Sequence, residues 1–243
     1  MFKYSLFLYL LSAASILHAD PLYFESGTKQ NTLVELYTSE GCSSCPPAEK
    51  FLNNLNNNTQ LWKTLYPVAF HVDYWDYLGW KDVFANKYFA ERQTRYARLK
   101  KVTTVYTPAF IVNGRSWRPG FFSDELPAIN KMAGNLVVAI DEKIIKASYQ
   151  RSGSENQELK LNVAVLGMAL KSNIARGENA GRNARHEFVV VGFGSAVSPD
   201  ARWKMQIPAL HYLKAKKYAV VAWVSTVNEP TPLQVTGGTL PKY

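Results

Sequence analysis

Two cysteines, Cys42 and Cys45, are the residues of this chain best suited to chemistry. They enclose Ser43 and Ser44 in a CxxC motif, and the 243-residue sequence contains only these 2 cysteines. A cysteine thiolate attacks a disulfide, and a second cysteine nearby resolves the mixed disulfide that forms. The motif therefore predicts a thiol–disulfide exchange site in which Cys42 is the nucleophile and Cys45 is the resolving residue.

The residues on either side of the motif predict that it joins a strand to a helix. The apolar run at 31–39 indicates a buried strand, and Gly41 ends it. The prolines at 46–47, followed by apolar residues at helical spacing, indicate the start of a helix. Backbone N–H groups and the helix dipole stabilise a thiolate at such a place. We therefore expect Cys42 at the beginning of the helix and Cys45 one turn further on.

A structural disulfide is the alternative use of this pair. A bond between residues so close in sequence closes a short loop and constrains the unfolded chain little. The loop-entropy relation gives about 2 kcal/mol for four residues, against about 4.7 kcal/mol for a loop of about 100 residues. A purely structural disulfide would therefore be better placed between distant segments, which favours redox use here.

Metal binding has weaker support in the sequence. A structural zinc site needs four nitrogen or sulfur ligands, and the histidines, His18, His71, His186 and His211, include no close pair. Thiolates also suit Cu(I), but no histidine or methionine is near the cysteines unless His71 folds toward them. His71 itself lies in an apolar run and is best interpreted as a core histidine. We therefore predict no metal and no other cofactor.

The pair Thr107–Pro108 is a second feature of interest, because it directly precedes an apolar run. X-Pro bonds adopt the cis form far more easily than other peptide bonds. A cis proline before a strand would present the backbone of Thr107 to a substrate held against Cys42. We therefore predict that Thr107 and Pro108 contribute to substrate binding.

Strands and helices are expected to alternate in the first part of the chain, which favours an α/β sheet. The predicted strands are 31–39, 67–73 and 108–113, and the predicted helices follow the cysteines and cover 84–100 and 123–147. After a polar linker at 148–158, strands are expected at 159–170, 186–194, 203–210 and 217–226. This pattern predicts one domain at 28–150 and a smaller β-rich domain at 158–243.

The beginning of the chain has the layout of a secretory signal peptide. Lys3 precedes a short apolar run, and Ala19 stands before a candidate cleavage site, so residues 1–19 are the predicted signal. The run is too short to span a membrane, and no stable membrane span is expected after cleavage. The protein is therefore predicted to be periplasmic or secreted, where paired cysteines usually form disulfides.

Several segments together resemble a known family. They are VELYTSEGCSSCPPAE (34–49), HVDYWDYLGWKD (71–82), TPAFIVNGR (107–115) and RGENAGR (176–182). They are similar to an uncharacterised secreted bacterial family with a thioredoxin-like core, the domain-of-unknown-function family 1223, over about residues 31–240. The resemblance implies an α/β thioredoxin-like core followed by a smaller mostly-β domain or extension. It also implies Cys42 as nucleophile, Cys45 as resolver and Pro108 as a cis proline facing the substrate.

The thioredoxin-like resemblance also points to Glu35. Those proteins keep a buried acid on the strand before the motif, and Glu35 matches it with an offset of about one residue. Burial would raise the pKa of its carboxyl and let it accept a proton from Cys45; the alternative is a solvent-facing Glu35. The segment 176–182 is interpreted as a turn rich in glycine, and it would control access if it folded over Cys42.

The sequence therefore predicts an exported thiol–disulfide oxidoreductase that acts on protein thiols or disulfides. If the protein acts as a reductant, an external redox partner must reduce its cysteine pair after each reaction, because the sequence has no third cysteine that could relay electrons. The alternative is a non-catalytic envelope binding module with a structural disulfide. The formal net charge of +9 is spread along the chain, and we predict no nucleic acid partner for an exported protein.

Overall fold

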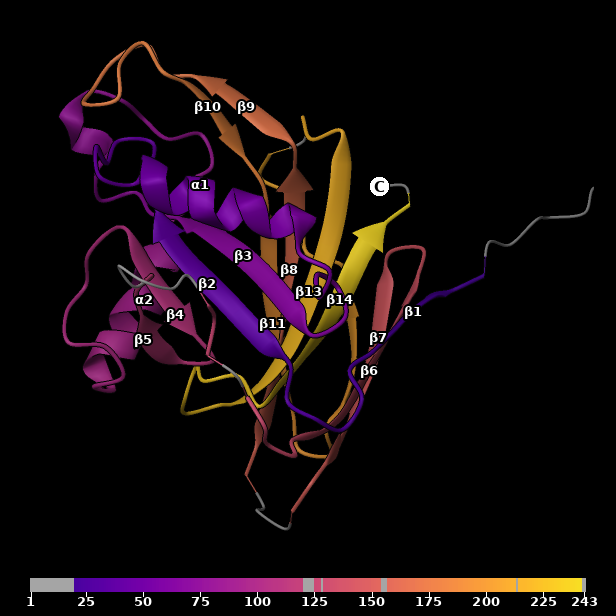
Figure 1. Cartoon of the computed structure of the whole chain (residues 1–243). Helices are drawn as coiled ribbons and strands as arrows, with labels where there is room; N and C mark the ends of the chain where they lie inside the picture. Colours follow the sequence, from indigo (N-terminus) through magenta and orange to yellow (C-terminus); the bar gives the residue numbers. More distant parts are fainter. Residues whose placement is uncertain (1–19, 120–124, 128, 154–156, 213, 242–243) are drawn as a thin grey trace, which may run out of the picture.

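The computed structural model describes residues 20–119, 125–127, 129–153, 157–212 and 214–241, which form a mostly β structure (Figure 1). Strands account for 45% of the chain and helices for 13%, and the described residues contain two α-helices. The predicted α/β class with a thioredoxin-like core is therefore wrong. Strands and helices alternate only up to Val112, and the described residues after it form strands without a further α-helix.

An eight-stranded sheet forms the centre of the structure, in the order β14-β13-β8-β11-β3-β2-β4-β5. Its strands are β2 (Thr32–Thr38), β3 (Leu65–His71), β4 (Ala109–Val112), β5 (Arg115–Trp117), β8 (Leu159–Met168), β11 (Val189–Ser198), β13 (Lys217–Thr226) and β14 (Gln234–Leu240). Strand β3 runs parallel to both β2 and β11, and the other neighbours are antiparallel. Every residue of β3 is buried, as expected for a parallel strand with both faces covered.

The two helices cover opposite faces of this sheet. They are α1 (Pro46–Asn54) and α2 (Lys87–Arg98), with short 3-10 helices η1 (Leu55–Asn57) and η2 (Asp76–Leu78). Phe51 of α1 packs edge-on against Phe110 of β4, whereas Phe89 of α2 packs against Phe70 of β3. Because successive side chains of a strand point to opposite faces, the residues of β2 face the α1 side and the α2 side of the sheet in turn.

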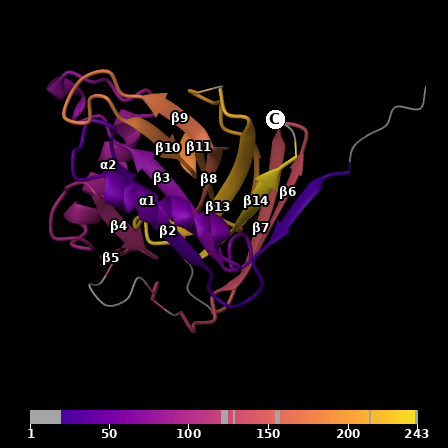
Figure 2. The ribbon, with the colours of Figure 1, turned by 45° about the horizontal axis from the view of Figure 1, so that its top comes forward.

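A second sheet packs on the β8 and β13 end of the first one (Figure 2). Its order is β1 (Leu22–Glu25), β6 (Gly134–Asp141), β7 (Ile144–Arg151) and β12 (Arg202–Gln206). Leu136 and Ile145 of this sheet share a buried core with Val163 and Val220 of the large sheet. A separate hairpin of β9 (Leu170–Asn173) and β10 (Asn183–His186) carries the segment 174–182 at its tip.

Most predicted strands are confirmed, but one predicted helix is wrong. The chain at 123–147, as far as it lies within the described residues, contains β6 and the start of β7. In β6, Leu136, Val138 and Ile140 are buried and alternate with partly exposed residues, which is the two-residue period of a strand. Strands β1, β5, β9, β10 and β14 were not predicted, and β11 begins later than the expected 186–194 strand.

The eight-stranded sheet includes strands from both sides of the predicted linker at 148–158. Strand β7 also extends to Arg151, within that linker. The predicted signal peptide at 1–19 lies outside the described residues. Among the described residues, neither α-helix has the length and the apolar composition that a membrane-spanning helix needs.

Candidate functional site

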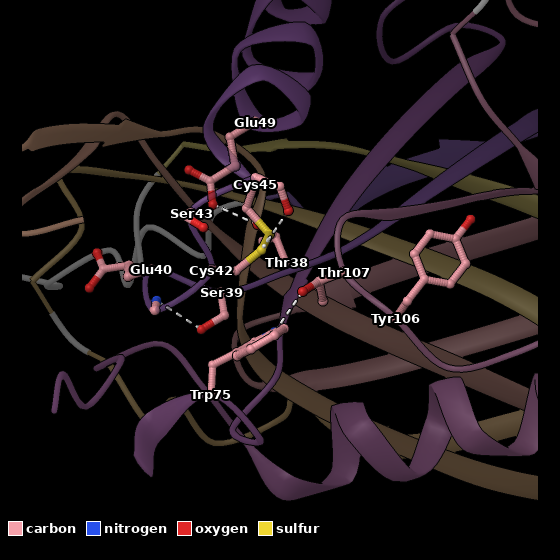
Figure 3. Close-up of a disulfide and its surroundings, with 12 residues drawn as sticks. Thr38, Ser39, Glu40, Cys42, Ser43, Cys45, Glu49, Trp75, Tyr106 and Thr107 are labelled. Carbon is pink, nitrogen blue, oxygen red and sulfur yellow. Dashed lines mark hydrogen bonds between the residues drawn. A yellow bond between two sulfur atoms is a disulfide. The ribbon is translucent and has the colours of Figure 1, made fainter. Parts of the chain in front are cut away.

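The two cysteines form a disulfide where the chain passes from β2 into α1 (Figure 3). Their Cα atoms are 5.4 Å apart, and the backbone N–H of Cys45 donates to the carbonyl of Cys42 at 3.2 Å. Cys45 is the N-cap residue of α1, and prolines occupy the first helical positions, where no N–H donor is needed. The helix start is confirmed, although Cys45, not Cys42, stands at the helix boundary.

Both cysteines are buried, with exposed fractions of 2% for Cys42 and 1% for Cys45. The segment between β9 and β10 lies against the motif. The side-chain amide of Asn179 donates to the carbonyl oxygens of Glu40 and Cys42, each at 2.8 Å. The N–H of Ser43 donates to Oε2 of Glu178 at 3.2 Å. Segment 174–182 is therefore hydrogen-bonded to the backbone of residues 40–43, next to the disulfide.

An open groove borders the motif on its other side. It has a volume of about 570 Å³ and is lined by Ser44, Pro47, Ala48, Phe51, Tyr106, Pro108, Phe110, Trp117, Arg118 and Pro119. The Thr107–Pro108 peptide bond is cis, and the indole N–H of Trp75 donates to Oγ1 of Thr107 at 2.6 Å (Figure 3). Ser44 also lies beside the disulfide, with its hydroxyl 3.4 Å from Sγ of Cys42. The structure thus places Pro108 and the cysteine motif along one groove.

Glu35 is not at the disulfide. Its carboxylate accepts two hydrogen bonds from Arg92 of α2, at 2.9 and 3.0 Å, and one from the hydroxyl of Tyr96 at 2.6 Å. Tyr37, two residues along β2, donates to the same carboxylate at 2.8 Å. Because Glu35 occupies the α2 face of the strand, the offset of one residue turns it away from Cys45. Glu35 is therefore the buried counter-ion of Arg92, whereas the sequence predicted a proton acceptor for Cys45.

A buried network of acids and histidines lies near the motif, and sequence reasoning missed it. Nδ1 of His71 is 2.7 Å from Oδ2 of Asp82, and Nε2 of His186 is 3.0 Å from Oε1 of Glu40. The two imidazole rings are 5.3 Å apart, although the sequence showed no close pair of histidines. Segment 71–82, one of the segments that carry the family resemblance, contributes His71 and Asp82 to the network.

Glu49 of α1 completes the network. Its Oε2 atom lies 3.2 Å from Nδ1 of His186, and the hydroxyl of Thr38 donates to its Oε1 atom at 2.7 Å (Figure 3). Burial by itself would lower the pKa of His186, but its contacts with the carboxylates of Glu40 and Glu49 outweigh burial and raise that pKa to about 10. Burial would raise the pKa of Glu49, yet its contacts with His186 lower it. Electrostatic attraction between His186 and the carboxylates of Glu40 and Glu49 therefore stabilises the cluster.

A polar cavity opens beside this network, on the side of α1 away from the groove. Its volume is about 670 Å³. Glu40, Glu49 and His186 contribute to its wall, together with Asn179 and Arg182 from the β9–β10 hairpin region. Solvent and small solutes can therefore approach the network from this cavity.

Comparison with solved structures shows the same overall fold in two other proteins. Protein AGR_C_4864 from Agrobacterium tumefaciens is 21% identical, with a TM-score of 0.60 over 86% of this chain and 94% of that one. HBP35 of Porphyromonas gingivalis is 13% identical, with a TM-score of 0.58 over 89% of this chain and 77% of that one. No curated protein matches this chain in sequence. The family model of a protein of unknown function, DUF1223, matches residues 33–225, and the chain therefore belongs to that family.

Proposed function

We propose that the protein is an exported thiol–disulfide oxidoreductase that exchanges disulfides with cysteine-containing polypeptides. One observation carries this proposal: the Cys42–Cys45 disulfide lies beside an apolar groove lined by both Ser44 of the motif and Pro108. Aromatic side chains such as Phe51 and Trp117 line the same groove and suit the apolar parts of a polypeptide. A bound polypeptide would thus hold its cysteine next to the motif.

The exchange conserves electrons and protons in two steps. A thiolate of the substrate attacks Sγ of Cys42, the Cys42–Cys45 bond breaks, and its electron pair remains on Cys45 as a thiolate. A second substrate thiolate then attacks the substrate sulfur of the mixed disulfide, which releases Cys42 as a thiolate. The substrate has lost two electrons, and an external disulfide oxidant returns the pair to its oxidised form. In the opposite direction, Cys42 attacks a substrate disulfide and Cys45 resolves it.

Exchange requires access to a buried sulfur. Cys42 is only 2% exposed, and attack on a disulfide needs an approach to the sulfur atom. The contacts of Asn179 and Glu178 with the motif must therefore break before a substrate reacts. Helix α1 stabilises the thiolate forms of the cysteines, because its N-terminus carries a partial positive charge.

The burial of both sulfur atoms favours a second function. In this alternative the disulfide is structural, and the groove alone binds a polypeptide or envelope component. The two functions differ in the reduction potential of the pair, because stable structural disulfides have potentials below about −300 mV.

Two measurements distinguish these functions. Equilibration with glutathione gives the reduction potential of the cysteine pair, and trapping of mixed disulfides shows whether Cys42 reacts with a substrate. The Cys45→Ala variant should accumulate a mixed disulfide with a cysteine-containing peptide, because the resolving thiol is gone. The Cys42→Ala variant is the matched control, since it retains one cysteine but loses the nucleophile. A potential below about −300 mV, with no adduct on either variant, would show that the disulfide is structural.

A further inference from the structure

We propose that Glu49, His71 and His186 form a binding site for a divalent transition-metal ion, with Zn²⁺ as the expected ion. One donor atom from each of these residues lies within 4.8 Å of the other two. The histidines have exposed fractions of 1% and 3%. This site is separate from the disulfide, and its existence does not depend on the exchange reaction proposed above.

The strongest indication is a pair of ring nitrogens without hydrogen-bond partners. Within the described residues, Nε2 of His71 and Nδ1 of His186 are both buried and make no hydrogen bond. Nδ1 of His186 lies 3.2 Å from Oε2 of Glu49, but the geometry is not that of a hydrogen bond. A buried polar atom without a partner costs about 1–3 kcal/mol, and a bound cation would satisfy both nitrogens at once.

The opposite nitrogen of each ring is held by a carboxylate. Asp82 faces Nδ1 of His71 at 2.7 Å, and Glu40 faces Nε2 of His186 at 3.0 Å. An ionised carboxylate only accepts hydrogen bonds, so each of these nitrogens carries the proton and a neutral ring keeps its lone pair on the other nitrogen. Metal-binding histidines nearly always show this arrangement.

Glu49 is oriented in a similar way. Its Oε1 atom accepts a hydrogen bond from Thr38 at 2.7 Å, which leaves Oε2 directed to His186. The three donors are therefore positioned by Asp82, Glu40 and Thr38.

The donor set selects the class of metal. Two imidazoles and one carboxylate match the three protein ligands of many catalytic zinc sites, whereas Mg²⁺ and Ca²⁺ prefer oxygen ligands. Metal–ligand bonds of about 2.0–2.1 Å imply donor separations of about 3.4 Å in a tetrahedral site. The His186–Glu49 separation of 3.2 Å already meets that condition, and ion binding would draw His71 inward. The 670 Å³ cavity along Glu49 and His186 offers a route and room for a fourth ligand.

A network without metal is the competing explanation. A protonated His186 would bridge Glu40 and Glu49, which accounts for its contacts with both acids. That explanation leaves Nε2 of His71 buried without a partner, and a bound ion removes this difficulty.

Zinc uptake by the full-length protein with its disulfide intact tests the proposal. After chelator treatment, loading with Zn²⁺ and desalting, elemental analysis should find about one zinc ion per chain. Co²⁺ should produce the visible absorption bands of a tetrahedral site with nitrogen and oxygen donors. His186→Gln and Glu49→Gln should abolish this uptake, and Glu40→Gln should weaken it about 10–100-fold. His211→Gln is the matched control, because this histidine bonds to the carbonyl of Phe84 outside the cluster.

Two results would overturn the proposal. The first is wild-type protein that retains no zinc, and the second is unchanged uptake by both His186→Gln and Glu49→Gln. If His186→Gln fails to fold, the partly exposed Glu49 provides the decisive variant. A double variant with serine at Cys42 and Cys45 should still bind Co²⁺ with the same spectrum. Loss of binding in that variant would instead assign the metal to the cysteines.

Discussion

Asn179 donates a hydrogen bond from its side-chain amide to the backbone carbonyl of Cys42, at 2.8 Å and across 137 residues of sequence. The same amide group bonds the carbonyl of Glu40. A single buried side chain therefore attaches the β9–β10 hairpin region to the disulfide. The contact ties segment 174–182 to the backbone of the cysteine motif.

Removal of this contact should make the disulfide easier to reduce. In Asn179→Ala two hydrogen bonds are lost and two buried carbonyls lose a donor, so we expect a loss of about 1–3 kcal/mol in stability. The rate of reduction by dithiothreitol, followed by alkylation of the new thiols, should rise several-fold at neutral pH. Asn183→Ala is the control, because Asn183 is exposed in the same hairpin. Equal reduction rates for both variants would show that Asn179 does not limit access.

Neutralisation of Glu35 should destabilise the protein without affecting disulfide exchange. Glu35→Gln leaves the guanidinium of Arg92 buried without its counter-ion, which costs about 3–5 kcal/mol for a buried pair. Urea unfolding should show this loss, whereas Glu91→Gln on the exposed side of α2 should not. The exchange rate per folded molecule should remain that of wild type. A large fall in this rate would restore Glu35 as the proton acceptor for Cys45.

The stability of the protein should fall in alkaline solution because of Tyr96. Burial and the nearby carboxylate of Glu35 raise the pKa of Tyr96 well above its usual value, whereas the unfolded chain loses this proton near pH 10. The folded state therefore retains the proton longer, so this stabilisation is complete below about pH 10 and is lost as the pH rises further.

Denaturant unfolding at a series of pH values can check this dependence. Tyr96→Phe should be less stable than wild type at pH 9, since its bond to Glu35 is gone, and the difference should narrow above about pH 10. Tyr77→Phe is the control, because Tyr77 is 78% exposed. A difference that stays constant with pH would contradict the raised pKa.

Truncation of Trp117 should weaken the binding of polypeptide substrates. Trp117 lines the groove and packs on Phe51 and Phe110 at its base. Trp117→Ala should raise KM for a cysteine-containing peptide about tenfold, which corresponds to about 1.4 kcal/mol of binding energy, and should leave kcat nearly unchanged. Tyr23→Ala removes an exposed aromatic residue from β1 and serves as control. A fall in kcat at constant KM would argue against a binding role for the groove.

The sequence alone determined the local features around the cysteines. Proline in the first turn and apolar residues at helical spacing specify where α1 begins, and the apolar runs specify β2, β3 and β4. These features depend on neighbours in the chain, so composition and period are sufficient to find them. The same reasoning failed at 123–147, where a helix was predicted although Leu136, Val138 and Ile140 alternate with partly exposed residues as in a strand.

The tertiary structure alone decided which side chains meet. Strand pairing and pleat place Glu35 on the α2 face, and a shift of one residue would have reversed that choice. Loop 174–182 reaches the disulfide only because the β9–β10 hairpin folds back over α1. His71 and His186 become neighbours through the packing of the sheet and that hairpin, and no period in the sequence encodes such a distance. Local order is set by adjacent residues, whereas the site depends on contacts between segments far apart in the chain.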